Sequence, residues 1–315
     1  MPASKSAIRI LSVVQPTVSI GMTVWNGEAF LSQTLESLLA QDYRDFELII
    51  LDNISTDRTP EICREYAQKD TRVKYILDDS QADVMQGHKK IAQLATGEFF
   101  MGACDDDWYA PGYVSTLVRL MMANQAVGLA YSGWGLIYPD GSKKPVDWKR
   151  FLKASNSTFY NFVYYLFFRI PIPIAFGIVR TKLHKDCLNY FYRPDHRGWN
   201  HDNLYMLRLL SMVRVDSTPD ILFYYRKRNR TALYKQRGQH YVVEGSYSQY
   251  LNHVKHQMSV TRAVSKIIDV STFSCVEKGT LRVYNLLVLL FHCGLSPLLT
   301  SRVRRVLKGQ WQSTA

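Results

Sequence analysis

The sequence predicts an α/β fold in which a mostly parallel sheet is flanked by helices. In the first half of the chain, short apolar and β-branched runs alternate with segments whose apolar residues recur at helical spacing. Acidic and amide residues follow three of those runs, and ligands of parallel sheets sit beyond the carboxyl ends of the strands. The 315 residues suffice for one large domain, or for one domain and a smaller appendage.

Four strands, each followed by a connecting segment, are expected up to Ala103. The strands are expected at Thr17–Val24, Phe46–Leu51, Val73–Leu77 and Gly97–Ala103. The helices between them are expected at Gly27–Ala40, from Thr59 to about Gln68, and at Gly87–Leu94. Thr59 is expected to be an N-cap, because Pro60 would then occupy the first helical position.

The second half is expected to complete the same domain before the composition changes. Helices are expected at Pro111–Met122 and His201–Leu210, a strand or hairpin at Val127–Tyr138, and a strand at Ile221–Tyr225. From Arg226 the sequence becomes basic and helical, which places a boundary near Tyr234. We therefore expect an N-terminal extension (1–16), a main domain (17–234, with halves 17–115 and 116–234) and a basic helical C-terminal region (235–315).

The net charge of +12 is unevenly distributed. Up to Ala110 there are 10 Lys and Arg against 17 Asp and Glu, and the remainder has 29 against 10. An acidic first third suits a bound cation, and a basic remainder suits phosphates or an anionic membrane. A solvated basic surface is the simpler interpretation for most of these residues.

The cysteines and the apolar stretches limit the setting in which the protein works. Five widely spaced cysteines without a CxxC pair argue against a disulfide framework or a zinc site and favour a reducing compartment. No convincing signal peptide is present, so we expect a cytoplasmic location. The longest uncharged stretch, Val283–Ser301, includes Asn285 and Pro297 and predicts a buried or interfacial helical pair rather than a membrane span.

Three adjacent carboxylates, Asp105, Asp106 and Asp107, follow the fourth expected strand. Their mutual repulsion is costly unless a cation offsets it. Carboxylate oxygens suit Mn²⁺ or Mg²⁺, which commonly take one or two carboxylates together with substrate phosphates. The alternative is an acidic loop that caps the helix beginning near Pro111. These three residues alone support both interpretations about equally.

Four motifs in a fixed order accompany the three carboxylates. They are Val18–Gly27, Leu35–Tyr43, Phe46–Asp57 and Ala95–Phe100, with Pro111 four residues beyond Asp107. Their order and spacing resemble those of the family 2 glycosyltransferases of GT-A fold, over about Thr17 to Arg226. The resemblance implies a Rossmann-like sheet and transfer of a sugar from a nucleotide diphosphate.

The resemblance implies a donor site near the ends of the first, second and fourth strands. The nucleotide-sugar would contact Thr23, Trp25, Asn26, Asp52, Asn53 and Asp105. Trp25 would stack on uracil or thymine, the alternative being a half-buried core aromatic. Asn53 stands where many relatives have an Asp that contacts the base, and its amide can still pair with a pyrimidine edge. A UDP- or dTDP-sugar is therefore the expected donor.

The resemblance also implies a metal site and a general base. Asp106 and Asp107 would hold Mn²⁺ or Mg²⁺, although the common Asp-x-Asp form would place an Asp where this chain has Cys104. Asp202 matches the acidic residue that removes the proton of the acceptor hydroxyl, which implies inversion at the anomeric carbon. The alternatives are that Asp202 only caps its helix, or that His196 or His201 is the base.

The basic segments suggest where the acceptor side of the reaction lies. Arg226–Arg230 would close over the diphosphate, unless it is a solvated loop. Leu281–Lys308 would lie on the anionic inner face of a membrane, unless it packs on the main domain as a helical pair. The expected acceptor is a glycan or a lipid-linked glycan of surface polysaccharide or glycolipid synthesis, and no nucleic-acid partner is expected.

Two other functions fit parts of the sequence. A sugar-phosphate nucleotidyltransferase would need a Gly-rich, basic loop after the first strand to hold a triphosphate, and Trp25–Glu28 lacks one. A catalytically inactive, membrane-associated scaffold is disfavoured because the acidic set is intact.

Overall fold

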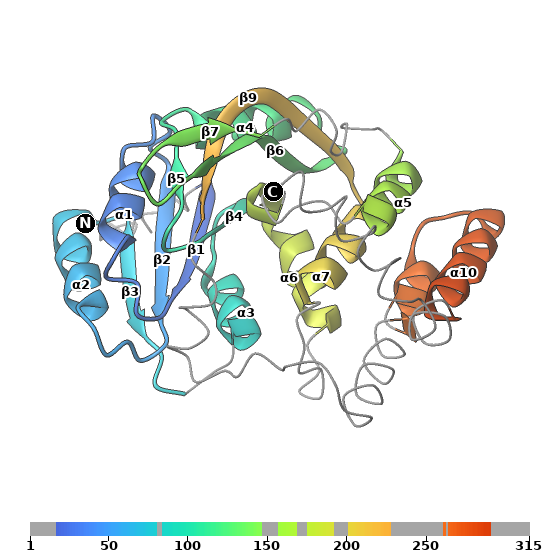
Figure 1. The fold of residues 1–315 in the computed structure, drawn as a ribbon, viewed down its shortest axis with the longest axis horizontal. Helices are drawn as coiled ribbons and strands as arrows, with labels where there is room; N and C mark the ends of the chain where they lie inside the picture. Colours follow the sequence, from blue (N-terminus) through green and yellow to red (C-terminus); the bar gives the residue numbers. More distant parts are fainter. Residues whose placement is uncertain are drawn as a thin grey trace, which may run out of the picture.

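The computed structural model describes residues 17–80, 84–146, 157–168, 175–191, 201–227, 261–262 and 264–290. The expected extension 1–16, the boundary near Tyr234, and the residues His196 and Arg228–Arg230 lie outside these ranges. Figure 1 shows the arrangement of the described elements.

Nine strands of the described residues form one sheet in the order β3-β2-β1-β4-β8-β6-β9-β5, with β7 paired to β6. The strands are β1 (Val18–Val24), β2 (Phe46–Asp52), β3 (Val73–Leu77), β4 (Phe99–Ala103), β5 (Trp108–Tyr109), β6 (Val127–Ile137), β7 (Lys143–Pro145), β8 (Ile178–Arg180) and β9 (Arg214–Arg226). β1 to β4 pair in parallel, which confirms the predicted core of the sheet. β8 is antiparallel to β4 and β6, whereas β9 is parallel to β6, so the second half is mixed.

The helices cover both faces of the sheet. They are α1 (Leu31–Leu39), α2 (Thr59–Lys69), α3 (Val84–Leu94), α4 (Tyr113–Ala123), α5 (Thr158–Phe168), α6 (Thr181–Phe191), α7 (His201–Leu210) and α10 (Cys275–Leu290). Side chains of α1, α2 and α4 belong to one apolar core, and those of α3, α5, α6 and α7 belong to the other (Figure 1). The two cores confirm the predicted α/β architecture.

Strand β1 shows how the sequence divides between the two faces. Its even-numbered apolar residues, Val18 to Val24, belong to the core on the α1 side. Its odd-numbered residues face α3, and a Cβ on Gly21 would lie 2.3 Å from Ile91 Cγ2. Glycine at this position therefore allows α3 to pack directly on the sheet.

A polar cluster around the buried Glu47 lies at the opposite end of the strands from the three aspartates. Glu47 accepts hydrogen bonds from Ser19 Oγ at 2.5 Å and from Thr96 Oγ1 at 2.7 Å, and Lys74 Nζ donates to it at 2.6 Å. Burial opposes ionisation, but these hydrogen bonds lower the pKa of Glu47 from 4.5 to about 2. The cluster ties β1, β2, β3 and the loop before β4 together.

Two details differ from the sequence prediction. Thr59 is the first residue of α2 and Arg58 is its N-cap, because the Thr59 hydroxyl accepts a hydrogen bond from Gly27 N at 2.8 Å instead of capping the helix. Strand β9 begins at Arg214 rather than at Ile221, since it pairs along most of β6 and absorbs register shifts near Ser132 and Gly133.

The described part of the C-terminal region is helical, as predicted. Residues 264–270 are helical, and Asn285 of α10 donates hydrogen bonds to Thr261 O at 2.8 Å and Ser265 Oγ at 3.0 Å. Leu281 is buried in the core shared with α5 and α7. Among the helices that the structure describes, none has the length and apolarity needed to cross a membrane.

Candidate active site

The loops after β1 and β2 are joined at the carboxyl edge of the sheet. Val24 pairs with Asp52 at the strand ends, and Asn53 N donates to Val24 O at 3.0 Å. Asn26 then bridges the loops, because its N donates to Ser55 Oγ at 2.9 Å and its Oδ1 accepts from Thr56 N at 2.8 Å. Its positive φ of 51° is one that asparagine tolerates well. The predicted donor loops are therefore brought together.

Asp52, the last residue of β2, stabilises the loop that follows this strand. Its side chain is fully buried, its Oδ1 accepts from Ser55 N at 2.9 Å and its Oδ2 accepts from Tyr75 OH at 2.9 Å. Both carboxylate oxygens thus stabilise the loop that presents Asn53. The predicted direct contact of Asp52 with a nucleotide stays a prediction.

Among the described residues, the sheet face towards α3 is uncovered beside Gly102, near the end of β4. Thr23 is half-buried on this face, and a Cβ on Gly87 of α3 would lie 3.1 Å from Thr23 Cγ2. A Cβ on Gly102, by contrast, would meet no atom of the described residues within 4 Å. The described residues therefore leave space for a ligand beside Gly102, a residue that no sequence motif marks.

The three aspartates differ in their surroundings. Asp105 and Asp106 are partly exposed, whereas Asp107 is fully buried. The carboxylate of Asp105 lies against the backbone of Gly27, since a Cβ there would be only 2.5 Å from Asp105 Oδ2. Glycine at position 27 is therefore what allows the β1 loop and Asp105 to approach each other.

The ligand atoms of Cys104, Asp106 and Asp107 lie within 4.8 Å of one another. This grouping suits a divalent cation, because a buried carboxylate at Asp107 is costly unless its charge is compensated. Carboxylates match Mn²⁺ or Mg²⁺, whereas a thiol is a softer ligand, so Asp106 and Asp107 form the better pair. The position of Cys104 is the one where the common Asp-x-Asp pattern has its first carboxylate.

Two residues brace the turn that carries the aspartates. The Thr34 hydroxyl of α1 lies 2.8 Å from Asp107 O and 3.1 Å from Asp105 O. Arg226, the last residue of β9, donates from Nε to Asp106 O at 2.7 Å and from its backbone N to Asp107 Oδ1 at 2.9 Å. The sequence analysis did not identify Thr34, and it placed Arg226 in a diphosphate loop rather than in this brace.

The turn rests on buried aromatic side chains. Burial raises the pKa of Tyr109 and Tyr113 well above the usual range, and the charge of Asp107 raises both further. Both phenols therefore stay neutral, and their rings pack edge to face with centroids 5.3 Å apart.

The predicted base lies in the first turn of α7, which begins at His201 as expected. The structure describes the backbone of Asp202 but not the position of its side chain. The helix itself is firmly held, because Tyr165 OH donates to Asn203 Oδ1 at 3.0 Å and Tyr205 OH lies 2.7 Å from His184 Nδ1.

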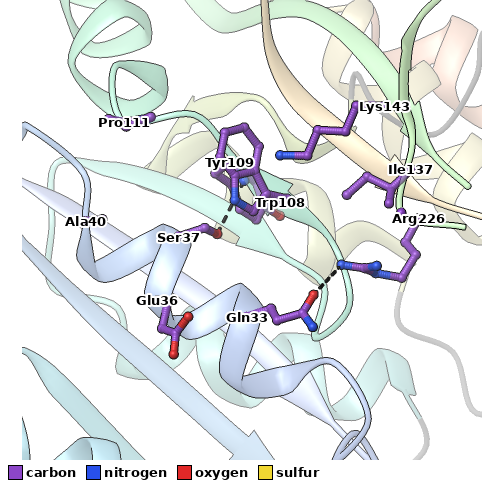
Figure 2. Close-up of a pocket in the computed structure, with 11 residues that line it drawn as sticks. Gln33, Glu36, Ser37, Ala40, Trp108, Tyr109, Pro111, Ile137, Lys143 and Arg226 are labelled. Atoms are coloured by element: carbon purple, nitrogen blue, oxygen red, sulfur yellow. Dashed lines mark hydrogen bonds between the residues drawn. The ribbon is translucent and has the colours of Figure 1, made fainter.

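A cleft of about 440 Å³ lies on the α1 side of the aspartate turn (Figure 2). It is lined by α1, by β5 and by the β6–β7 hairpin, and Arg226 forms part of its wall. Apart from Arg226, none of the site residues predicted from the sequence lines it. This cleft is separate from the open sheet face beside Gly102.

Comparison with known proteins identifies what the chain resembles. The family model described as Glycosyl transferase family 2 matches residues 19–183. The chain is 36% identical over 104 residues to the glycosyltransferase EpsH of Bacillus subtilis, which covers 33% of this chain and 30% of that protein. It is 30% identical over 105 residues to the GalNAc(5)-diNAcBac-PP-undecaprenol beta-1,3-glucosyltransferase of Campylobacter jejuni, covering 33% and 34%. The chain thus spans about a third of the length of these relatives.

Solved structures share the fold at low sequence identity. Residues 1–349 of S. aureus TarS in complex with UDP-GlcNAc align with a TM-score of 0.63 at 19% identity, over 87% of this chain and 72% of that chain. The mannosyltransferase PcManGT of Pyrobaculum calidifontis, in complex with GDP-Man and Mn²⁺, aligns with a TM-score of 0.53 at 16% identity, over 92% and 89%. These alignments establish a GT-A-like fold.

Proposed function

The chain belongs to glycosyl transferase family 2, and from this premise we propose that it transfers a sugar from a UDP- or dTDP-sugar to a hydroxyl of a glycan or lipid-linked acceptor. One observation carries the proposal. The loops after β1 and β2 and the aspartate turn after β4 meet at one edge of the sheet, beside an open face. Ligands of open α/β sheets bind at this edge.

The donor nucleotide is assigned to the loops after β1 and β2. Trp25 is half-buried there and offers a ring for stacking on a pyrimidine, and Asn53 offers an amide for its edge. Thr23 and Asn26 complete the pocket, and Asp52 fixes the loop from below. TarS binds UDP-GlcNAc and PcManGT binds GDP-Man in solved complexes, which supports a nucleotide-sugar here.

The diphosphate is assigned to the aspartate turn. Asp106 and Asp107 would hold Mn²⁺ or Mg²⁺, and the ion would supply Lewis-acid stabilisation of the departing diphosphate. Asp105, which lies against Gly27, would orient the ribose side of the donor. Thr34 and Arg226 hold the backbone of this turn, and the backbone N of Arg226 also holds the carboxylate of Asp107.

The proton of the acceptor hydroxyl is assigned to Asp202. As the acceptor oxygen bonds to the anomeric carbon and the bond to the diphosphate breaks, this carboxylate takes the proton. With Asp202 as the base and the acceptor hydroxyl as the nucleophile, a single displacement would invert the anomeric configuration. The firm attachment of α7 to α5 and α6 supports a fixed base.

The setting proposed for the reaction is surface polysaccharide or glycolipid synthesis on the cytoplasmic side of a membrane. Relatives with partial coverage include a colanic acid biosynthesis glycosyl transferase of Escherichia coli and the undecaprenol-linked glucosyltransferase. On α10, Val276, Val283 and Leu286 expose 80%, 61% and 54% of their surface on one helix face, beside the exposed Arg282. This face is suited to an anionic lipid surface.

A thermal-shift screen of nucleotide-sugars with and without Mn²⁺ tests the proposal. UDP- or dTDP-sugars should raise the melting temperature in the presence of Mn²⁺, because they bind only the folded state. The best donor should then release its nucleoside diphosphate when acceptor glycans are supplied. Release of pyrophosphate from a nucleoside triphosphate would instead identify a nucleotidyltransferase, and stabilisation by no nucleotide-sugar would refute the proposal.

A further inference from the structure

The cleft beside α1 has a wall built from in-register rows of side chains (Figure 2). Ile137 of β6 pairs with Lys143 of β7 on one side and with Arg226 of β9 on the other. Directly paired residues place their side chains on the same face of a sheet, so Lys143 and Arg226 flank Ile137. We call this cleft the β7 pocket.

The next row adds the Trp108 ring to the wall and places Tyr224 beside that ring. Tyr224 of β9 pairs with Gly135 of β6 and with Trp108 of β5. A Cβ on Gly135 would lie 2.7 Å from the Tyr224 ring, so glycine leaves room for that ring. Trp108 and Tyr224 meet edge to face at 5.6 Å. The wall of the β7 pocket therefore combines a flat aromatic surface with two cations.

The two cations lie on the two strands that flank Ile137. Lys143 is exposed, and its Nζ lies 3.1 Å from the centroid of the Trp108 ring. Partial burial lowers the pKa of Lys143, and the charge of Arg226 lowers it further. None of the ion pairs found among the described residues involves Lys143. In Figure 2 the carboxylate of Glu36 points away from both cations.

An anion between the cations would offset their repulsion and gain charge-assisted hydrogen bonds. Gln33 of α1 adds an amide on the facing wall, and its Oε1 accepts a hydrogen bond from Arg226 Nη2 at 3.1 Å. Trp108 adds a surface against which a ring can pack. The volume of about 440 Å³ exceeds that needed for a bare ion and falls within the range of small-molecule sites.

We propose that the β7 pocket is a second binding site, which takes the phosphate or carboxylate group of a sugar-sized anionic ligand between Lys143 and Arg226. Because Arg226 also donates to Asp106 O, a ligand here would touch the same side chain that braces the aspartate turn. The site is distinct from the donor site, and its ligand binding does not depend on sugar transfer.

The test is a calorimetric titration of the full chain with inorganic phosphate, glucose 1-phosphate, glucuronate and glucose. Lys143→Gln should weaken binding of the anionic ligands about tenfold, as expected for one lost charge-assisted hydrogen bond. Lys144→Gln is the matched control, because it removes the same charge from the next residue, whose Nζ lies 5.1 Å from the Tyr138 ring on the opposite face. Lys143→Arg should retain binding.

Ligand binding should also be visible in tryptophan fluorescence, because it changes the contact between Lys143 and Trp108. The response should disappear in Trp108→Phe. Tighter binding of glucose 1-phosphate or glucuronate than of inorganic phosphate would support the sugar-sized site. Equal weakening by Lys143→Gln and Lys144→Gln, binding of phosphate alone, or no binding of any anion would overturn the proposal.

Discussion

Replacing Gly27 with alanine tests whether the contact between the β1 loop and Asp105 positions the donor site. The added Cβ would lie 2.5 Å from Asp105 Oδ2 and 2.9 Å from Val24 Cγ2. To reach a tolerable separation of 3.0 to 3.4 Å, the carboxylate must retreat by about 0.5 to 0.9 Å. Overpacking of this kind costs about 1–3 kcal/mol of stability.

The effect on function should exceed the effect on stability. A displacement of about 1 Å in a positioned group can reduce a rate on the order of 100-fold. Urea denaturation would give the change in stability. Calorimetry with the best donor and Mn²⁺ would give the donor affinity, and a transfer assay would give the turnover. Gly279→Ala is the control for adding a methyl group. Gly279 lies in helix α10, and a Cβ there would meet no described atom within 4 Å.

Gly279→Ala should be neutral or should stabilise the chain by up to about 1 kcal/mol. If Gly27→Ala lost stability but kept normal donor affinity and turnover, Asp105 would not belong to the donor site. If it lost neither, the close approach of Gly27 and Asp105 would not exist in solution.

Three further predictions concern other parts of the chain. Asp202→Asn should keep donor affinity and lose sugar transfer, and near-normal turnover would exclude Asp202 as the base. Glu47→Gln should lower the free energy of unfolding at pH 7 by about 1–3 kcal/mol. The pKa of Glu47 is about 2 in the folded protein against an ordinary 4.5. The variant should therefore melt at a lower temperature than the parent above pH 4.5, and this difference should vanish as the pH falls towards 2. A persistent difference at pH 2 would refute this assignment. Val283→Glu on α10 should reduce co-sedimentation with anionic liposomes, and full binding would remove the proposed membrane contact.

Most of the first sheet half could be predicted because its signals are local. The strands and helices up to Ala103 follow hydrophobic periodicity, and the aspartate run directly follows β4. The start of β9 at Arg214 could not be predicted, because Arg214–Asp220 has a polar composition and is a strand only through pairing with β6.

The residues that brace the aspartate turn were harder to predict from the sequence. The Thr34 hydroxyl is a helix side chain whose partners are carbonyls 71 and 73 residues away. Arg226 could be recognised as a cation near a phosphate site, but its bond to Asp106 O depends on the register of β9 against β6. The β7 pocket depends on the same register, so no local sequence motif predicts it.

The most direct test of the central claim is a titration of the best nucleotide-sugar with and without Mn²⁺ in the parent chain and in Asp106→Ala. Mn²⁺ should strengthen donor binding in the parent, and the substitution should remove this gain while leaving the folded state intact. Donor affinity that is the same with and without Mn²⁺ in both proteins would contradict the assignment of the aspartate turn as a metal and diphosphate site.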